Sequence, residues 1–147
     1  MLTSASGALT LRREHYLYRQ RVARPYDDVR LDLEFAITEH NFRITGGNTI
    51  GAAIAQRHGE DFPRSEILHF CNLEHARRLL QRAPDFLSYL PCVIFLREAG
   101  AEVVVETWLL PEDDPRIGQA GRNINAILRD IVDYATIEWP GDSPDPP

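Results

Sequence analysis

The sequence predicts an α+β fold, in which a mixed, mostly antiparallel sheet of about five strands is covered by two long helices and one short helix. Short apolar runs with alternating side chains recur along the chain, as in strands that bury one face. Stretches with a 3.6-residue apolar period separate most of these runs and indicate helices. Two runs, 92–96 and 102–109, are joined by Glu98-Ala99-Gly100, which predicts a hairpin. This alternation favours a sheet with helices on one face.

The first half of the chain is expected to form a strand over 16–22, a helix over 25–41, a strand over 42–45 and a short helix over 50–57. Tyr16, Tyr18 and Val22 fall on alternate positions, which suits a strand. Pro25 suits the first position of a helix. Gly46-Gly47-Asn48 is expected to break the second strand.

The second half is expected to form a strand over 65–71, a helix over 73–82, strands over 92–96 and 102–109, and a long last helix from Asp114-Pro115 to Ala135. Asn72 stands where the N-cap of the 73–82 helix belongs. The last helix has an apolar stripe that includes Ile117, Ile124 and Leu128.

Length and charge set the domain organisation and exclude two classes of partner. We expect a loose leader over 1–14, a single domain over 15–138 and a disordered tail over 139–147. The net charge of −6 opposes binding to nucleic acids or to anionic membranes, because both depend on clustered positive charge. There is no apolar run of membrane-spanning length and no signal-peptide pattern, so a soluble, cytoplasmic protein with reduced cysteines is expected.

The chemically most informative residues are two cysteines and their neighbouring histidines. His69 and Cys71 are two positions apart on one strand and therefore share a face, and His75 lies one helical turn beyond Cys71. Thiolate and imidazole suit copper(I) or zinc, and a b-type haem needs only an axial ligand and an apolar slot. We expect His69, Cys71 and His75 as cofactor-binding residues, and His69, Cys71 and Cys92 as metal ligands.

Two other interpretations of the cysteines stay open. Both fit the pattern of small buried residues in strands. Alternatively, the helix that follows Cys71 would lower the pKa of its thiol and make it a nucleophile, with Cys92 as the resolving thiol. There is no C-x-x-C pattern, no catalytic residue is assigned, and whether Cys71 and Cys92 approach each other depends on a sheet order that the sequence does not decide.

Several segments together resemble the domain of unknown function 302 family. They are Gly46 to Ala53, Ile67-Leu68-His69-Phe70-Cys71-Asn72, Ala76 with Leu79-Leu80, Leu90-Pro91-Cys92-Val93-Ile94, and Val103-Val104-Val105-Glu106 before Leu110-Pro111. Leu73 departs from the proline that many members carry after the asparagine. The resemblance covers about residues 16–136 and implies a compact α+β fold, often a homodimer, with no established activity, in bacteria and archaea.

The function expected from these features is a small binding domain, in preference to an enzyme, that holds copper, zinc or haem b near the Cys/His cluster for storage, delivery or sensing. One alternative is a thiol-based redox or sulfur-transfer enzyme that uses Cys71. The other is a non-catalytic dimeric interaction module. The expected partners are a second copy of the chain and a small ligand or metal.

Overall fold

The computed structural model describes residues 16–138, and the leader and tail expected from the sequence lie outside this range. The elements in chain order are β1 (Leu17–Val22), α2 (Tyr26–Glu39), β2 (Arg43–Asn48), α3 (Ile50–His58), β3 (Ser65–Cys71), α4 (Leu73–Arg82), the 3-10 helix η1 (Pro84–Tyr89), β4 (Cys92–Ala99), β5 (Glu102–Trp108) and α5 (Gly118–Ala135).

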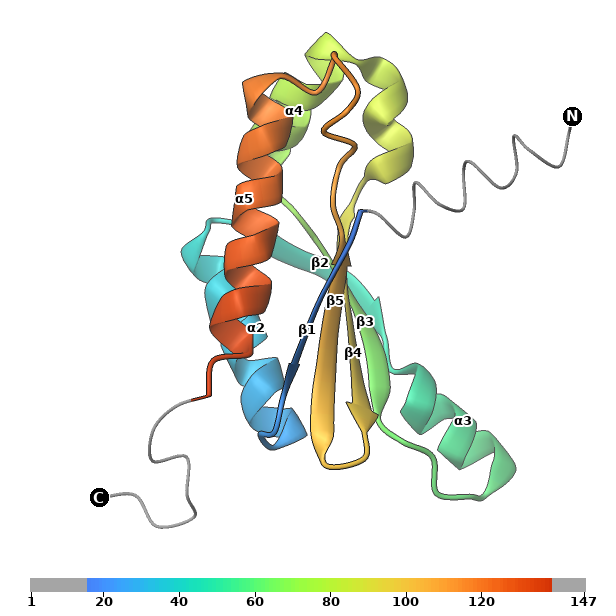
Figure 1. Ribbon diagram of the computed structural model, residues 1–147. Helices are drawn as coiled ribbons and strands as arrows, with labels where there is room; N and C mark the ends of the chain where they lie inside the picture. Colours follow the sequence, from blue (N-terminus) through green and yellow to red (C-terminus); the bar gives the residue numbers. More distant parts are fainter. Residues whose placement is uncertain (1–15, 139–147) are drawn as a thin grey trace, which may run out of the picture.

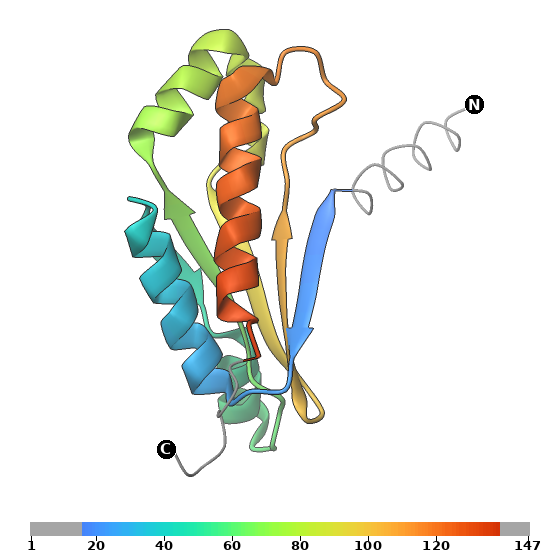
Figure 2. The ribbon, with the colours of Figure 1, turned by 60° about the vertical axis from the view of Figure 1, so that its left-hand side comes forward.

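The strands form one sheet in the order β1-β5-β4-β3-β2, and every neighbouring pair is antiparallel. Figures 1 and 2 show the long helices α2 and α5 side by side against one face of this sheet. The α+β class and the five strands predicted from the sequence are therefore confirmed. No helix within residues 16–138 is long and apolar enough to cross a membrane.

The hydrophobic core lies between the sheet and the two long helices. On the central strand β4, Ile94 and Leu96 are buried toward the helices, while the alternate residues lie on the other face. Leu33 on α2 and Leu128 and Ile131 on α5 close the core from the helical side. Each such side chain stabilises the fold by about 1.5–3 kcal/mol through removal of apolar surface from water. The apolar period of α5 thus forms its buried stripe, as predicted.

The opposite face of the sheet is free of long helices and mixes apolar and charged side chains. Val93 and Phe95 on β4 and Trp108 on β5 are partly buried there. Glu106 is buried on this face because Arg19 holds it through two hydrogen bonds of 2.9 and 2.8 Å to its Oε2. The helix-free face is therefore partly apolar, and the charge of its buried Glu106 carboxylate is balanced by Arg19 of the same chain.

A buried polar contact fixes the start of α2 on the sheet. The Tyr26 hydroxyl and the Arg30 Nε each donate a hydrogen bond of 2.9 Å to Oε1 of the buried Glu66 on β3. Burial, and then the bond to Glu66, raise the pKa of the Tyr26 hydroxyl. The Arg64 guanidinium lies 4.0 Å above the centroid of the Tyr26 ring. The first turn of α2 is thereby tied to β3.

Two boundaries predicted from the sequence are wrong, and η1 was not predicted at all. Gly46-Gly47-Asn48 does not end the second strand but pairs with β3 after an irregularity between Ile44 and Gly46. A Cβ on Gly47 would lie 2.7 Å from the Ile67 carbonyl oxygen, so this pairing needs a glycine. The last helix begins at Gly118 and not at Asp114, whose carboxylate instead accepts the Arg116 backbone N–H at 2.9 Å.

Asn125 on α5 fixes the segment that follows β5. Its side chain is fully buried, with Nδ2 donating to the Leu110 carbonyl at 3.0 Å and Oδ1 accepting the Leu110 N–H at 2.7 Å. The amide side chain thus makes the two backbone hydrogen bonds to Leu110 that a neighbouring strand would make within a sheet. Both buried backbone groups of Leu110 are satisfied by this one residue.

We predict that Asn125→Ala lowers the free energy of unfolding by about 1–3 kcal/mol, because it leaves a buried N–H and C=O without partners. Urea denaturation followed by circular dichroism measures the change. Asn123→Ala is the matched control, since Asn123 is exposed on the same helix and bonds only to the side chain of Gln119. Equal losses for the two variants would contradict the role given to Asn125.

Candidate functional site

The sheet register separates the residues that the sequence grouped into a metal site. Cys92 is paired directly with Phe70, so both point into the helix-covered core. His69 and Cys71, on either side of Phe70, lie on the helix-free face. The predicted sharing of a face by His69 and Cys71 agrees with this register. Cys92 belongs to the other face, because directly paired residues point to the same side of a sheet and Cys92 is paired with Phe70.

His75 is a packing residue in this arrangement. Its ring stacks on Phe42, with the centroids 5.5 Å apart and the planes at 18°. Burial, and then the positive charge of Arg78, lower the pKa of His75, so its imidazole is neutral at neutral pH. Within residues 16–138 there is no group of three His, Cys, Asp or Glu side chains placed to hold a metal ion. A site made of His69, Cys71 and Cys92 is therefore not assembled in one copy of the chain.

Neither cysteine has the electrostatics of an activated thiol. Burial raises the pKa of Cys71, and a backbone hydrogen bond involving Asn72 lowers it by less. The start of α4 therefore does lower this pKa, as the sequence predicted, but burial outweighs it and the net shift is upward. The predicted N-cap at Asn72 is confirmed. Its Oδ1 accepts hydrogen bonds from the backbone N–H groups of Glu74 and His75, so these two donors are not available to the Cys71 sulfur. Burial, and then the charge of Cys71, raise the pKa of Cys92 to about 12.

A pocket lies elsewhere, at the end of the β4–β5 hairpin that is remote from its turn. It has a volume of about 500 Å³ and opens between η1, the start of β4, the end of β5 and α5. This volume lies within the range of small-molecule sites in proteins. Its lining is formed by Tyr16, Ser88, Tyr89, Leu90, Pro91, Cys92, Val93, Trp108, Leu109, Leu110, Pro111 and Leu128.

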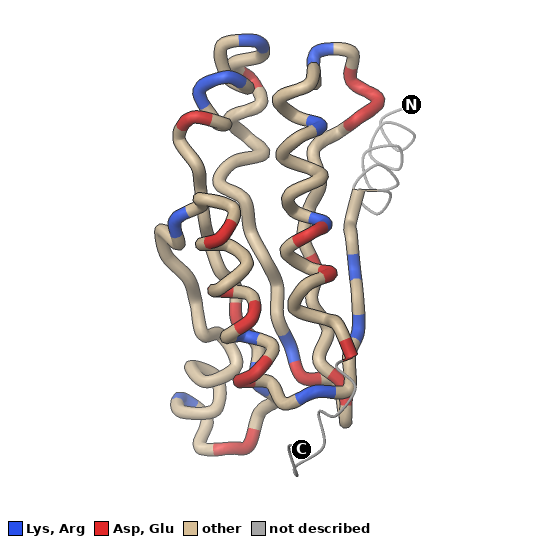
Figure 3. Tube along the Cα trace, turned by 90° about the vertical axis from the view of Figure 1, so that its left-hand side faces the viewer, with Lys and Arg blue, Asp and Glu red and all other residues tan. Residues whose placement is uncertain are grey.

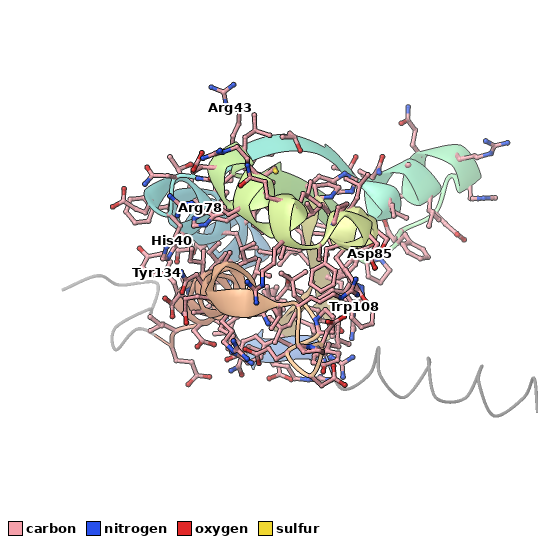
Figure 4. All side chains as sticks on the ribbon, turned by 90° about the horizontal axis from the view of Figure 1, so that it is seen from above. His40, Arg43, Arg78, Asp85, Trp108 and Tyr134 are labelled. Carbon is pink, nitrogen blue, oxygen red and sulfur yellow. The ribbon has the colours of Figure 1, made fainter. Side chains whose placement is uncertain are left out.

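The walls of the pocket are mostly apolar and include the rings of Tyr16, Tyr89 and Trp108. Figure 4 shows the labelled Trp108 on the side of the molecule away from His40 and Tyr134. The polar groups among the lining residues are hydroxyls, the indole N–H and the Cys92 thiol, which the raised pKa keeps protonated. Two of the hydroxyls are engaged within the protein, because Tyr16 donates to Asp113 and Ser88 donates to the Asp85 carbonyl. The pocket therefore suits a flat and largely apolar ligand.

Two contacts hold the mouth of this pocket in shape. The Tyr16 hydroxyl donates to Oδ1 of Asp113 at 2.5 Å, and the Tyr16 carbonyl accepts the Leu109 N–H at 2.8 Å. Asn125 fixes Leu110 from the side of α5, as described above. The segment after β5 is thus held on both sides by contacts within the protein.

Sequence reasoning named several of these residues but missed the pocket. Leu90-Pro91 stands immediately before β4 and Leu110-Pro111 shortly after β5. Because β4 and β5 form a hairpin, these two Leu-Pro pairs meet at the same end of the sheet. Both Leu-Pro pairs and the hairpin can be read from the sequence, and they place Cys92 and Trp108 at the same end of the sheet. The contribution of Tyr16 was not visible, because it depends on β1 pairing with β5.

Comparisons with known proteins agree with the fold. The family model described as domain of unknown function DUF302 matches residues 18–131. A solved structure of an uncharacterised conserved DUF302 protein from Bacillus stearothermophilus is similar, with a TM-score of 0.69 and 19% identity over 82% of this chain and 98% of the other. At that identity the likeness concerns the fold alone. No curated protein matches the chain.

We predict that both cysteines react slowly with iodoacetamide at pH 8, and Cys92 much more slowly than Cys71. The pKa of Cys92, about 12 against an ordinary value of 9.0, reduces its thiolate fraction about a thousandfold. Mass spectrometry of timed samples measures each rate, and protein unfolded in guanidinium is the control in which both thiols react alike. Native Cys71 reacting faster than a free thiol would contradict this prediction and favour a thiol enzyme.

Proposed function

The chain belongs to the DUF302 family, and on that premise we propose that it is a binding domain for a small, flat and largely apolar molecule. The observation that supports this proposal is the aromatic pocket at the end of the β4–β5 hairpin, with its volume of about 500 Å³. The general role is the one expected from the sequence, which is binding for storage, delivery or sensing. The ligand class differs from the copper or zinc expected there.

The chemistry of the pocket supports binding more than catalysis. Burial raises the pKa of the lining thiol of Cys92 to about 12, which favours its protonated, unreactive form. Rings of Tyr16, Tyr89 and Trp108 offer stacking surface, and the fastened segment after β5 limits the entropy lost on binding. These features favour uptake of a ligand into an already formed site.

Haem is the second candidate, because Cys92 lines this pocket and is one of the predicted ligands. A thiolate can serve as an axial ligand of haem iron. Cys92 would have to lose its proton to do so, against a pKa of about 12. The apolar walls suit a porphyrin ring whether or not the iron is ligated, so the two candidates are separated by comparing haem with metal-free porphyrin.

The test uses 1-anilinonaphthalene-8-sulfonate, a fluorescent probe with an aromatic, apolar body and one sulfonate group. We predict saturable binding to the whole chain, weakened about threefold to tenfold in Tyr89→Ala through loss of ring stacking. Leu87→Ala is the matched control, since Leu87 is exposed on the same short helix and does not line the pocket. Absence of saturable binding, or equal effects of the two variants, would contradict the proposal.

A second titration compares ferric haem with protoporphyrin IX. A pocket that selects flat apolar molecules binds both with similar affinity, and Cys92→Ala changes neither. If the ligand is haem held by iron, Cys92→Ala weakens haem alone and removes the shifted Soret band of the complex.

Homodimerisation stays a prediction from the family resemblance, and we propose the helix-free face of the sheet as its surface. Phe95 lies in the middle of that face on β4, between Ile67 and Glu106 of the adjacent strands. We predict that Phe95→Ser shifts a dimer toward monomer in sedimentation velocity, because it removes apolar surface from the centre of the interface. The matched control is Leu73→Ser on α4, where the side chain is 82% exposed. A wild-type chain that sediments as a monomer at high concentration would refute this.

A further inference from the structure

A second, shallower groove lies on the outer surface of the helical layer, away from the pocket. It runs between α2 and α5 and has a volume of about 420 Å³. Phe35 and Ala36 line it from α2, and Tyr134 and Ile137 from α5 and the residues just after it. Figure 4 shows His40 and Tyr134, which both line the groove, on the same side of the molecule. The groove and the pocket share no lining residue.

Large apolar side chains are exposed along this groove. Phe35 lines the groove and is 51% exposed. Leu31 does not line the groove, but it is 64% exposed one turn before Phe35 and extends the apolar strip on the same side of α2. Ile137 at the other side of the groove is 38% exposed. The ring of Phe35 contacts that of Tyr134 with the centroids 5.6 Å apart. A single exposed leucine means little, but aligned apolar side chains beside a groove are typical of a binding surface.

The rim of the groove is acidic and lacks ion-pair partners. Glu39, Asp130 and Asp133 line it, and Glu138 follows at its end. Within residues 16–138, none of the four forms a salt bridge with an arginine, although Asp133 accepts hydrogen bonds from the Tyr18 hydroxyl at 2.6 Å and from the Gln20 amide at 3.3 Å. Figure 3 shows acidic positions along both α2 and α5 on this side of the molecule. The groove therefore combines an apolar floor with an acidic rim whose carboxylates form no salt bridge within residues 16–138.

We propose that this groove is a docking site for an amphipathic helix of another protein, one with an apolar stripe flanked by Lys and Arg. The apolar side chains of such a helix would pack against Leu31, Phe35 and Ile137, and its cations would face the acidic rim. A third helix laid between α2 and α5 continues the ridges-into-grooves packing of the layer. This site is independent of the pocket and of the ligand proposed for it.

The charge of the chain argues against its own tail as the occupant. Residues 139–147 follow the groove directly and read WPGDSPDPP, with two acidic side chains, no basic one and four prolines. Like charges along the rim and a high proline content suit neither the electrostatics of the groove nor a helix. The partner that fits is therefore cationic and helical.

The probe is a synthetic amphipathic peptide with leucines at helical spacing and lysines beside them, titrated by isothermal calorimetry. Leu31→Ser with Phe35→Ser is expected to weaken binding at least about tenfold through lost apolar burial. Leu73→Ser with Leu87→Ser is the matched control, because both side chains are exposed and lie away from the groove. The same peptide with glutamates in place of its lysines should not bind.

A second pair of variants tests the rim. Glu39→Gln with Asp130→Asn should weaken peptide binding about threefold to tenfold and reduce its dependence on salt. Glu60→Gln with Asp61→Asn removes two exposed charges elsewhere and should leave affinity unchanged. Glu39 and Asp130 line the groove, whereas Glu60 and Asp61 do not. Thermal denaturation verifies that each variant folds.

Three outcomes would overturn the proposal. Equal losses of affinity in Glu39→Gln with Asp130→Asn and in Glu60→Gln with Asp61→Asn would mean that the peptide responds only to the overall negative charge. Wild-type affinity in Leu31→Ser with Phe35→Ser would exclude the groove. A dimer in sedimentation velocity that dissociates in that variant would assign the groove to contact between copies of this chain.

Discussion

Side chains on successive residues of a strand point to opposite faces, and here only one face of the sheet is covered by the long helices. This constraint decides which side chains form the core and which stay on the helix-free face. On β4, Cys92, Ile94 and Leu96 enter the core, while Val93 and Phe95 stay on the other side. A slip of one residue in the pairing with β3 would exchange the two sets and bury none of the apolar face correctly. The same alternation divides the cysteines between two environments.

The predicted elements agree best with the structure where the determining contacts are local. The β4–β5 hairpin follows from its turn and its alternating strands, and the start of α4 follows from the cap at Asn72. Local patterns failed where a distant segment decides the outcome. Gly47 lies in a strand because β3 approaches it closely, and α5 begins late because Asp114 caps a turn first. Neither partner can be read from the neighbouring sequence.

The candidate site shows the same division between local and distant information. The common face of His69 and Cys71 needs only the period of a strand. The position of Cys92 needs the register of β3 with β4, which the sequence left open. A cluster of chemically suitable residues is therefore no evidence of a site until the topology is known. The pocket, by contrast, is formed by residues that have little chemical reactivity and share one end of a hairpin.

The two outer strands of the sheet are also informative. β2 is exposed along its whole length, and the irregularity between Ile44 and Gly46 interrupts its ladder. β1 carries the charged side chains of Arg19 and Arg21. Bulged or charged outer strands are poor templates for a further strand. Pairing of a further strand along the hydrogen-bonding direction of the sheet is therefore disfavoured, which lowers the tendency to fibril-like aggregation and leaves the faces of the sheet and the helices as the better surfaces for assembly.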